Sequence, residues 1–250
     1  MEQRPVRMGK EEGILMIIKE KRSIIPACDV ETLEELGRLV KATCMIQGVS
    51  AYKIGFELVI PFGMKKVVEI IRRHTDKPII YDHQKAGTDV PFTGERFAKV
   101  CKASGVDAVI LFPQAGPETL RAWIAACQAQ GLQVIVGGEM THKGFLQSDG
   151  GFISDDAPSR IYALAAEQGI TDFVVPGNKP EQITTYRQLL EAKGVKPAFY
   201  SPGLISQGGD LTEGAKAAGD SWHAIIGRAL YQADDMAAKA KELVAALVMS

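Results

Sequence analysis

Eight short apolar runs, separated by segments with a helical pattern, restrict the fold of this chain more than any other feature. Between the runs, apolar residues recur with the period of an α-helix, for example in residues 30–45, 61–74, 117–130 and 158–169. Short apolar strands that alternate with helices are typical of a parallel sheet covered on both faces. The runs stand at residues 23–28, 50–55, 77–82, 106–112, 132–138, 171–176, 196–201 and 222–227.

Eight such units in 250 residues favour one closed (β/α)8 TIM barrel over an open doubly wound sheet. No G-x-G-x-x-G motif follows the first run, which argues against a dinucleotide-binding fold. We expect the barrel to occupy residues 23–250 and residues 1–22 to form an N-terminal extension. Within that extension, residues 10–22 have the pattern of an amphipathic helix, whose apolar side chains are expected to cap the bottom of the barrel: Ile14, Leu15, Ile17 and Ile18.

Composition excludes several classes of partner. The net charge is −1, so we expect no broad attraction to nucleic acid or to an anionic membrane. No apolar run approaches the roughly 20 residues that a membrane-spanning helix needs, and residues 1–13 lack the pattern of a signal peptide. The 4 cysteines form no C-x-x-C pair, and no His/Cys/Asp cluster has metal-ligand spacing. We therefore predict a cytoplasmic protein with reduced thiols and no bound metal.

Glycine-rich turns follow the last two predicted strands. In a barrel of this type, functional groups lie at the carboxyl ends of the strands, and the last two loops commonly hold phosphate. The sequence SPGLISQGGD (201–210) brings Pro202, Gln207, Gly208 and Gly209 to one loop, and Gly227 and Arg228 follow the eighth run. Backbone amides and a guanidinium bind phosphate well. The alternative is that the glycines only end strands and that Arg228 is a solvated surface charge.

A second polar group follows the third run, in the sequence YDHQKAGTD (81–89). Asp82 and Asp89 flank Lys85, and Lys53 lies inside an apolar strand, where an unpaired lysine is costly. If these side chains face the same mouth, they form an array of alternating charge, and the carboxylates raise the pKa of Lys85 so that it stays protonated. A solvated surface cluster is the alternative.

These segments resemble the orotidine 5'-monophosphate decarboxylase family over residues 23–240. SPGLISQGGD and IIGRALYQADD are similar to that family's two phosphate loops, and EMTHKGF (139–145) is similar to its pyrimidine-contacting segment. DVPFT (89–93) is similar to its Asp-Ile-Pro segment with a following threonine. The family motif D-x-K-x-x-D here reads D-x-x-K-x-x-x-D, which predicts a bulged loop around Lys85. Thr141 stands where the family has serine, and Lys143 where it has proline.

The resemblance implies decarboxylation of orotidine 5'-monophosphate to UMP in pyrimidine biosynthesis, without a cofactor. It implies that Asp82 repels the substrate carboxylate and that Lys85 protonates the carbanion at C6, with Lys53 and Asp89 completing the catalytic array. It further implies a homodimer in which Asp89 and Thr93 reach the partner's site. The residues that it assigns to the substrate are Asp29, Lys53, Thr93, Thr141, Pro202, Gln207, Gly208, Gly209, Gly227 and Arg228.

Two alternatives stay open at this point. A Mg²⁺-dependent sugar-phosphate decarboxylase or synthase of the same superfamily would use the same barrel with a metal held by acidic ligands. A non-catalytic barrel that binds a nucleotide would keep the pocket and lack turnover, and the lengthened motif around Lys85 is the feature that favours it.

Overall fold

The computed structural model describes residues 17–83, 89–205 and 207–248. Each of the eight predicted apolar runs contains one strand, and all strand pairs are parallel. The strands are β1 (Arg22–Pro26), β2 (Tyr52–Ile54), β3 (Ile79–Asp82), β4 (Ala108–Leu111), β5 (Gln133–Gly137), β6 (Asp172–Val174), β7 (Ala198–Ser201) and β8 (Ser221–Ile226).

The sheet curves into a nearly closed barrel. Its order is β1-β8-β7-β6-β5-β4-β3-β2, so that β1 and β2 stand at the two ends. These two ends meet through isolated parallel bridges, Ile24 with Val49 and Ala27 with Lys53, rather than through a continuous ladder. The amide of Cys28 donates to the carbonyl of Lys53 at 2.8 Å. The predicted TIM barrel is thereby confirmed.

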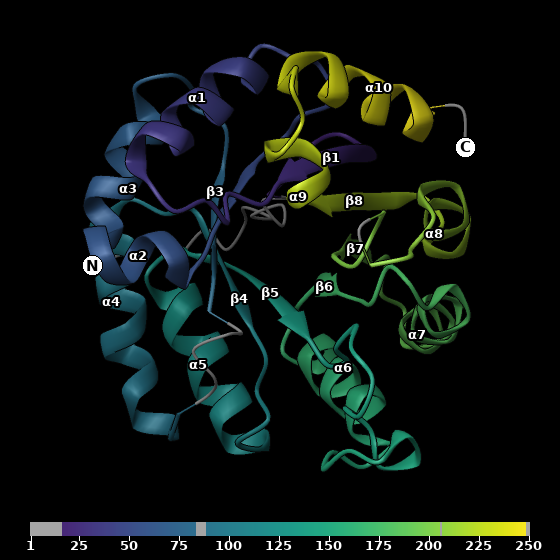
Figure 1. The fold of residues 1–250 in the computed structure, drawn as a ribbon. Coiled ribbons are helices and arrows are strands. Elements are labelled where there is room, and N and C mark those ends of the chain that lie inside the picture. Colours follow the sequence, from purple (N-terminus) through teal and green to yellow (C-terminus); the bar gives the residue numbers. More distant parts are fainter. Residues whose placement is uncertain (1–16, 84–88, 206, 249–250) are drawn as a thin grey trace, which may run out of the picture.

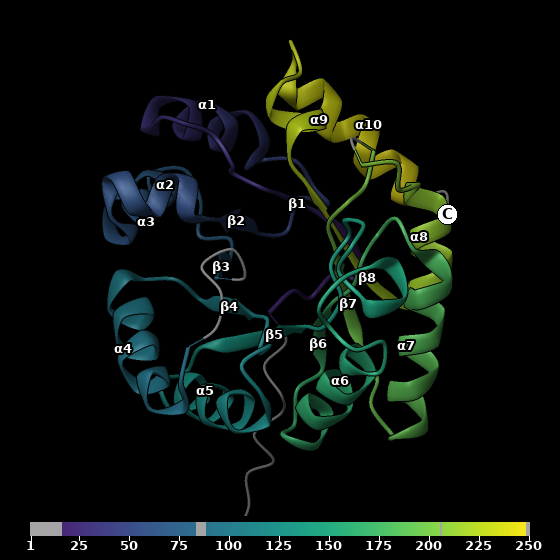
Figure 2. The same cartoon turned by 60° about the horizontal axis from the view of Figure 1, so that its bottom comes forward.

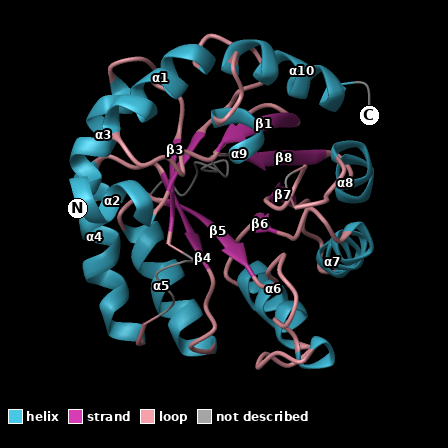
Figure 3. Ribbon diagram, in the orientation of Figure 1, coloured by secondary structure: helices cyan, strands magenta, loops and turns pink. Residues whose placement is uncertain are grey.

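Helices surround the strands as an outer ring (Figures 1 and 2). Figure 3 shows the strands inside this ring. None of the helices in the described part of the chain has the length and apolar character needed to cross a membrane. Their bounds are α1 (Leu33–Thr43), α2 (Phe56–Phe62), α3 (Met64–Arg72), α4 (Gly94–Ser104), α5 (Pro117–Ala129), α6 (Ala157–Glu167), α7 (Pro180–Ala192), α8 (Leu211–Ala218), α9 (Arg228–Tyr231) and α10 (Met236–Val248).

Local sequence explains where several helices begin and end. Thr32 accepts a hydrogen bond from the amide of Glu35, whose side chain bonds back to Thr32, so a capping box starts α1. The segment 61–74, expected as one helix, is divided at Gly63, where φ is +80° and the helical path is interrupted between α2 and α3.

The predicted helix at residues 10–22 is wrong in its described part. Residues 17–21 contain no helix, and β1 already begins at Arg22. Ile14 and Leu15 lie outside the described residues. Ile17 and Ile18 are buried, and both belong to the apolar cluster inside the barrel. They pack into that cluster from a segment without regular secondary structure that lies directly before β1.

The barrel interior also contains a buried polar layer. The Tyr200 hydroxyl donates to Asp172 at 2.8 Å, and the His223 Nδ1 atom lies 2.8 Å from the Ser23 hydroxyl oxygen. Burial lowers the pKa of His223 to about 3, so this ring is neutral at physiological pH. The larger apolar cluster lies between the strands and the surrounding helices and includes Leu36, Tyr52 and Trp222.

Candidate active site

A cavity of about 520 Å³ opens at the carboxyl ends of the strands. Its apolar wall comes from residues such as Ile110, Phe112 and Val174, which suit the face of a planar ring. Charged and polar groups from separate loops converge around that wall. Of the predicted site residues, those that line the cavity are Asp29, Lys53, Asp82, Thr141, Pro202, Gln207, Gly227 and Arg228.

Lys53 joins two carboxylates on one side of this cavity. Its Nζ atom lies 3.0 Å from Asp29 Oδ1 and 3.0 Å from Asp82 Oδ2. The side chain of Lys53 is 5% exposed and that of Asp82 is 2% exposed. The strands position these groups, because Lys53 is central in β2 and Asp82 ends β3, with both side chains inside the barrel. Three residues far apart in sequence thus form a charged array around Lys53, with Asp29 and Asp82 as its partners; the predicted array joined Lys53 and Asp82 to Lys85 and Asp89, and that grouping stays a prediction.

Electrostatics keeps this lysine protonated. Burial alone lowers the pKa of Lys53, but the carboxylates of Asp82 and Asp29 outweigh burial and raise it above its ordinary value. The array therefore presents an ammonium ion held between two carboxylates. This arrangement fixes the ammonium position in a largely buried site, where charged groups interact more strongly than they do in water.

Lys85 and Asp89, the other two residues predicted for the charged array, follow β3 in the sequence. Lys85 lies outside the described residues. Asp89 and Thr93 do not line the cavity; they border a separate surface depression with His83, Phe97 and Trp123. Because side chains alternate along β3, Asp82 faces inward while His83 packs outward on Phe97 at 4.4 Å between ring centroids. Burial lowers the pKa of His83, although the nearby Asp82 and Asp89 oppose that shift.

The two glycine-rich loops lie together at another side of the cavity. Gln207 and Arg228 are both exposed and both line the cavity, together with Pro202 and Gly227. Arg228 begins α9 directly after Gly227, so β8 brings its guanidinium to the mouth of the barrel. An exposed guanidinium beside an amide side chain is suited to an anionic group such as a phosphate.

Gly208 and Gly209 have a structural role in this loop. The amide of Gly208 donates to Ile205 at 3.1 Å and that of Gly209 donates to Gly203 at 3.2 Å, and neither residue lines the cavity. A Cβ atom on Gly209 would lie 2.7 Å from the Gly203 carbonyl oxygen, which leaves no space for a side chain. Asp210 accepts the first amides of α8, those of Thr212 and Glu213. The amides of Thr212 and Glu213 are therefore already bonded, and the assignment of Gly208 and Gly209 to a ligand stays a prediction.

Several cavity residues were not assigned from the sequence, among them Glu57, Glu139 and Tyr231. Glu57 follows β2, Glu139 follows β5, and Tyr231 ends α9. Burial, followed by the charge of Asp29, raises the pKa of Tyr231. Glu139 is 2% exposed. It directly follows the apolar run 132–138, and the expectation that functional groups lie at the carboxyl ends of the strands could have identified it.

Comparison with known proteins is consistent with this geometry. Residues 22–243 match the model of the orotidine 5'-phosphate decarboxylase / HUMPS family. The orotidine 5'-phosphate decarboxylase of Methanosarcina barkeri is 32% identical over 231 residues, which cover 91% of this chain and 96% of that protein. That of Methanosarcina mazei is 31% identical and covers 84% of this chain and 88% of its own.

Solved structures agree in fold. The orotidine 5'-monophosphate decarboxylase of Methanocaldococcus jannaschii has a TM-score of 0.79 at 23% identity, covering 91% of this chain and 99% of that chain. The enzyme from Pyrococcus horikoshii has a TM-score of 0.74 at 25% identity, covering 90% and 99%. On the family match, the curated relatives and the shared barrel, this chain belongs to the orotidine 5'-phosphate decarboxylase / HUMPS family.

Proposed function

We propose that this chain decarboxylates orotidine 5'-phosphate to UMP in pyrimidine biosynthesis. The observation that carries the proposal is the Asp29–Lys53–Asp82 array, with Lys53 and Asp82 buried, on the wall of the cavity at the carboxyl ends of the strands. Curated relatives that align with most of this chain are orotidine 5'-phosphate decarboxylases. The array would place charged side chains next to the substrate carboxylate that leaves as CO2.

The substrate would span the cavity between its charged ends. Gln207, Arg228 and the loop glycines would hold the phosphate, with Pro202 and Gly227 shaping that wall. Thr141 would bind the pyrimidine, and Asp29 and Lys53 would hold the ribose hydroxyls. Because the ring would lie on the apolar wall, its reacting carbon would face the array.

Repulsion and protonation would drive the reaction. Asp82 would lie near the substrate carboxylate, and one such pair at ~4 Å with an effective dielectric of ~20 costs about 4 kcal/mol, or roughly a thousandfold in rate. Loss of CO2 removes that repulsion and leaves a carbanion at C6. Lys85, which lies outside the described residues, would stabilise the carbanion and then protonate it.

The Mg²⁺-dependent alternative is not favoured. Lys53 already holds its ammonium group 3.0 Å from both Asp29 and Asp82, in the place that a cation would take between these carboxylates. The curated relatives at 31% and 32% identity are the nucleotide enzymes. Activity that persists in EDTA would support the decarboxylation of orotidine 5'-phosphate, and strict dependence on added Mg²⁺ would contradict it.

A homodimer with shared sites is part of the proposal. Asp89 and Thr93 border a surface depression next to Val90 and Phe92, which are 44% and 74% exposed. Apolar side chains this exposed suit burial against a second copy, which would bring Asp89 and Thr93 to the partner's ribose. A cytoplasmic location is also proposed, in keeping with the free thiols of Cys28, Cys44, Cys101 and Cys127.

The decisive assay mixes the purified protein with orotidine 5'-monophosphate and EDTA and follows the ultraviolet absorbance. Rapid conversion by the wild type and none by Lys85→Ala would support both the reaction and its proton donor. UMP binding without conversion by the wild type would instead favour a non-catalytic nucleotide-binding barrel.

A further inference from the structure

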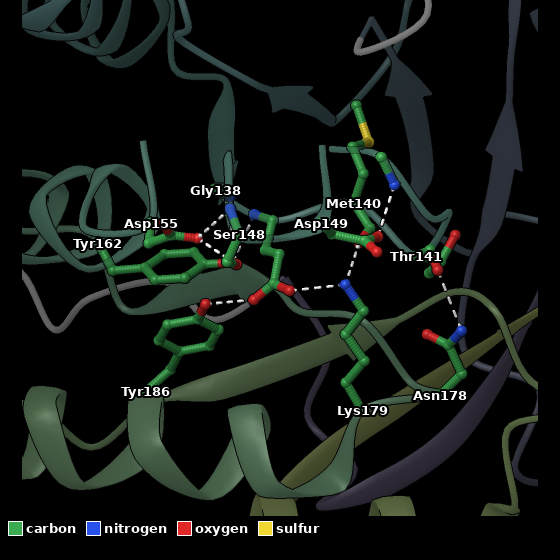
Figure 4. A network of polar contacts seen from close by, with 12 residues as sticks. Gly138, Met140, Thr141, Ser148, Asp149, Asp155, Tyr162, Asn178, Lys179 and Tyr186 are labelled. Carbon is green, nitrogen blue, oxygen red and sulfur yellow. Dashed lines mark hydrogen bonds and ion pairs between the residues drawn. The ribbon is translucent and has the colours of Figure 1, made fainter. Parts of the chain in front are cut away.

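Side chains from two other segments hold the backbone that follows β5. The Tyr162 hydroxyl, from α6, accepts the amides of Gly138 at 3.1 Å and Glu139 at 3.3 Å, and donates to the carbonyl of Val174 at 2.7 Å. Lys179 donates to the carbonyl of Met140 at 3.1 Å. Asn178 donates to the carbonyl of Thr141 at 3.1 Å. Every residue from 138 to 141 is therefore fixed through its main chain, and Figure 4 shows these contacts converging on the loop.

Glu139 connects these anchors. Its Oε1 atom accepts a hydrogen bond from Lys179 at 2.7 Å, and its Oε2 atom accepts one from the Tyr186 hydroxyl. The side chain of Glu139 is 2% exposed, whereas that of Lys179 is 29% exposed, so the ion pair joins a buried carboxylate to a partly exposed ammonium group. Both oxygens are committed to neighbours, which suits a positioning role better than direct chemistry.

We infer that Glu139 is a positioning residue which, through Lys179 and Tyr186, holds the loop after β5 in the shape that selects a pyrimidine. The inference rests on the proposed function, because it takes Thr141 as the contact to the base. The ion pair between Glu139 and Lys179 is the physical basis of this role, because each charge balances the other. Without Lys179, the buried carboxylate would lose its cation, and the loop would have to move for Glu139 to reach water.

The network acts on only one part of the ligand. Its bonds to the loop after β5 are made at residues 138–141, whereas the candidate phosphate side chains, Gln207 and Arg228, follow β7 and β8. Loosening the loop should therefore weaken contacts to the base and leave contacts to the ribose phosphate intact. This separation gives the inference a measurable signature that a general loss of stability does not produce.

The experiment measures the dissociation constants of UMP and of ribose 5-phosphate, which lacks the base, by calorimetry. Lys179→Met and Asn178→Ala should each weaken UMP binding by about tenfold or more, the effect of losing one bond to a well-placed polar group. Binding of ribose 5-phosphate should stay within about twofold, a change too small to reflect a lost hydrogen bond. Lys179→Arg keeps the charge and should restore most of the UMP affinity, and Glu139→Gln should give an intermediate loss.

Lys193→Met is the matched control. Lys193 pairs with Glu167 at 3.0 Å and connects the ends of α7 and α6, the same helices, but it is exposed and does not line the cavity. It should change neither dissociation constant. Thermal unfolding of each variant identifies those that fold.

Unchanged UMP affinity in folded Lys179→Met and Asn178→Ala would overturn the inference, as would equal weakening of both ligands. Failure of the proposed function would look different, because the wild type would bind UMP without decarboxylating orotidine 5'-monophosphate. The variants would still decide the positioning role in that case. A wild type that does not bind UMP would overturn both.

Discussion

The Nζ atom of Lys53 lies 3.0 Å from the Oδ2 atom of Asp82, and both side chains are almost completely buried. Removing the cation should therefore be costly. We expect Lys53→Met to abolish decarboxylation and to lower the free energy of unfolding by about 3–5 kcal/mol, because it removes the ammonium group that lies 3.0 Å from the buried carboxylate of Asp82.

Urea unfolding and the turnover assay measure these two effects. Lys239→Met is the control, since Lys239 pairs with Glu242 on the surface at 2.7 Å and such exposed pairs contribute less than about 1 kcal/mol. Equal stability losses in the two variants would contradict the buried role of Lys53.

Arg228 should act on the phosphate. We expect Arg228→Ala to lower kcat/KM for orotidine 5'-monophosphate by roughly a hundredfold, since a charge-assisted pair contributes about 1.5–3 kcal/mol. The same variant should process orotidine, which has no phosphate, as slowly as the wild type does. Arg160→Ala changes an exposed arginine paired only with Asp156 on the surface, and it should leave both rates unchanged. A similar loss with both substrates would assign Arg228 to the fold instead.

Gly209 should tolerate no side chain. Its added Cβ would meet the backbone oxygens of Gly203 and Gly177 at 2.7 Å and 2.9 Å, so the loop after β7 must shift in Gly209→Ala. We expect UMP affinity to fall by about tenfold, in line with a lost phosphate contact.

Gly37→Ala is the matched control for this substitution. Gly37 lies in α1, where the nearest atom would be 3.8 Å away, and alanine there should add about 0.5–1 kcal/mol of stability. Unchanged UMP affinity in Gly209→Ala would separate this loop from phosphate binding.

His223 should make the barrel sensitive to acid. Its folded-state pKa is about 3 and its ordinary value is 6.5, so below pH 6.5 the unfolded chain takes up a proton that the folded chain refuses. This contribution to stability is complete above pH 6.5 and is lost as the pH falls toward 3, by about 1.4 kcal/mol per pH unit.

Urea unfolding between pH 4 and pH 7 compares the wild type with His223→Leu. The wild type should lose stability more steeply, and parallel curves would show that His223 takes up a proton as readily in the folded chain as in the unfolded chain.

The proposed dimer can be tested through Phe92. Phe92→Asp should shift the protein toward a monomer in sedimentation velocity and reduce turnover, because Asp89 and Thr93 would no longer reach a partner. Phe152→Asp changes a side chain between β5 and α6 that is 98% exposed, and it should alter neither property. A monomeric, fully active Phe92→Asp variant would contradict shared sites.

The sequence predicted the barrel because periodicity is a local property. Every apolar run became a strand, and the cost of burying Lys53 without a partner correctly indicated nearby carboxylates. The same local argument gave a wrong helix at residues 10–22. Ile17 and Ile18 fit a helical spacing, but they are buried because they lie directly before β1 and join the cluster inside the barrel.

The contacts that the loops make could not be predicted from the periodicity of the sequence. The glycines of SPGLISQGGD suggested close approach to a ligand. At Gly209, however, a side chain is excluded because its Cβ atom would lie too close to the carbonyl oxygen of Gly177, which follows a different strand. The anchors of Glu139 come from the start and the body of α7, some 40 and 47 residues away. No spacing along the chain encodes such contacts, because they arise when helices pack around the closed sheet.

The discontinuous junction between β1 and β2 gives the charged array a second consequence. Asp29 follows β1 and Lys53 belongs to β2, so their ion pair fastens the barrel where it has isolated bridges in place of a ladder. A ligand whose ribose hydroxyls bind Asp29 would alter this ion pair. Amide hydrogen exchange at Cys28, whose N–H donates to the carbonyl of Lys53, would then report occupancy of the site as a change in how often the barrel opens along that junction.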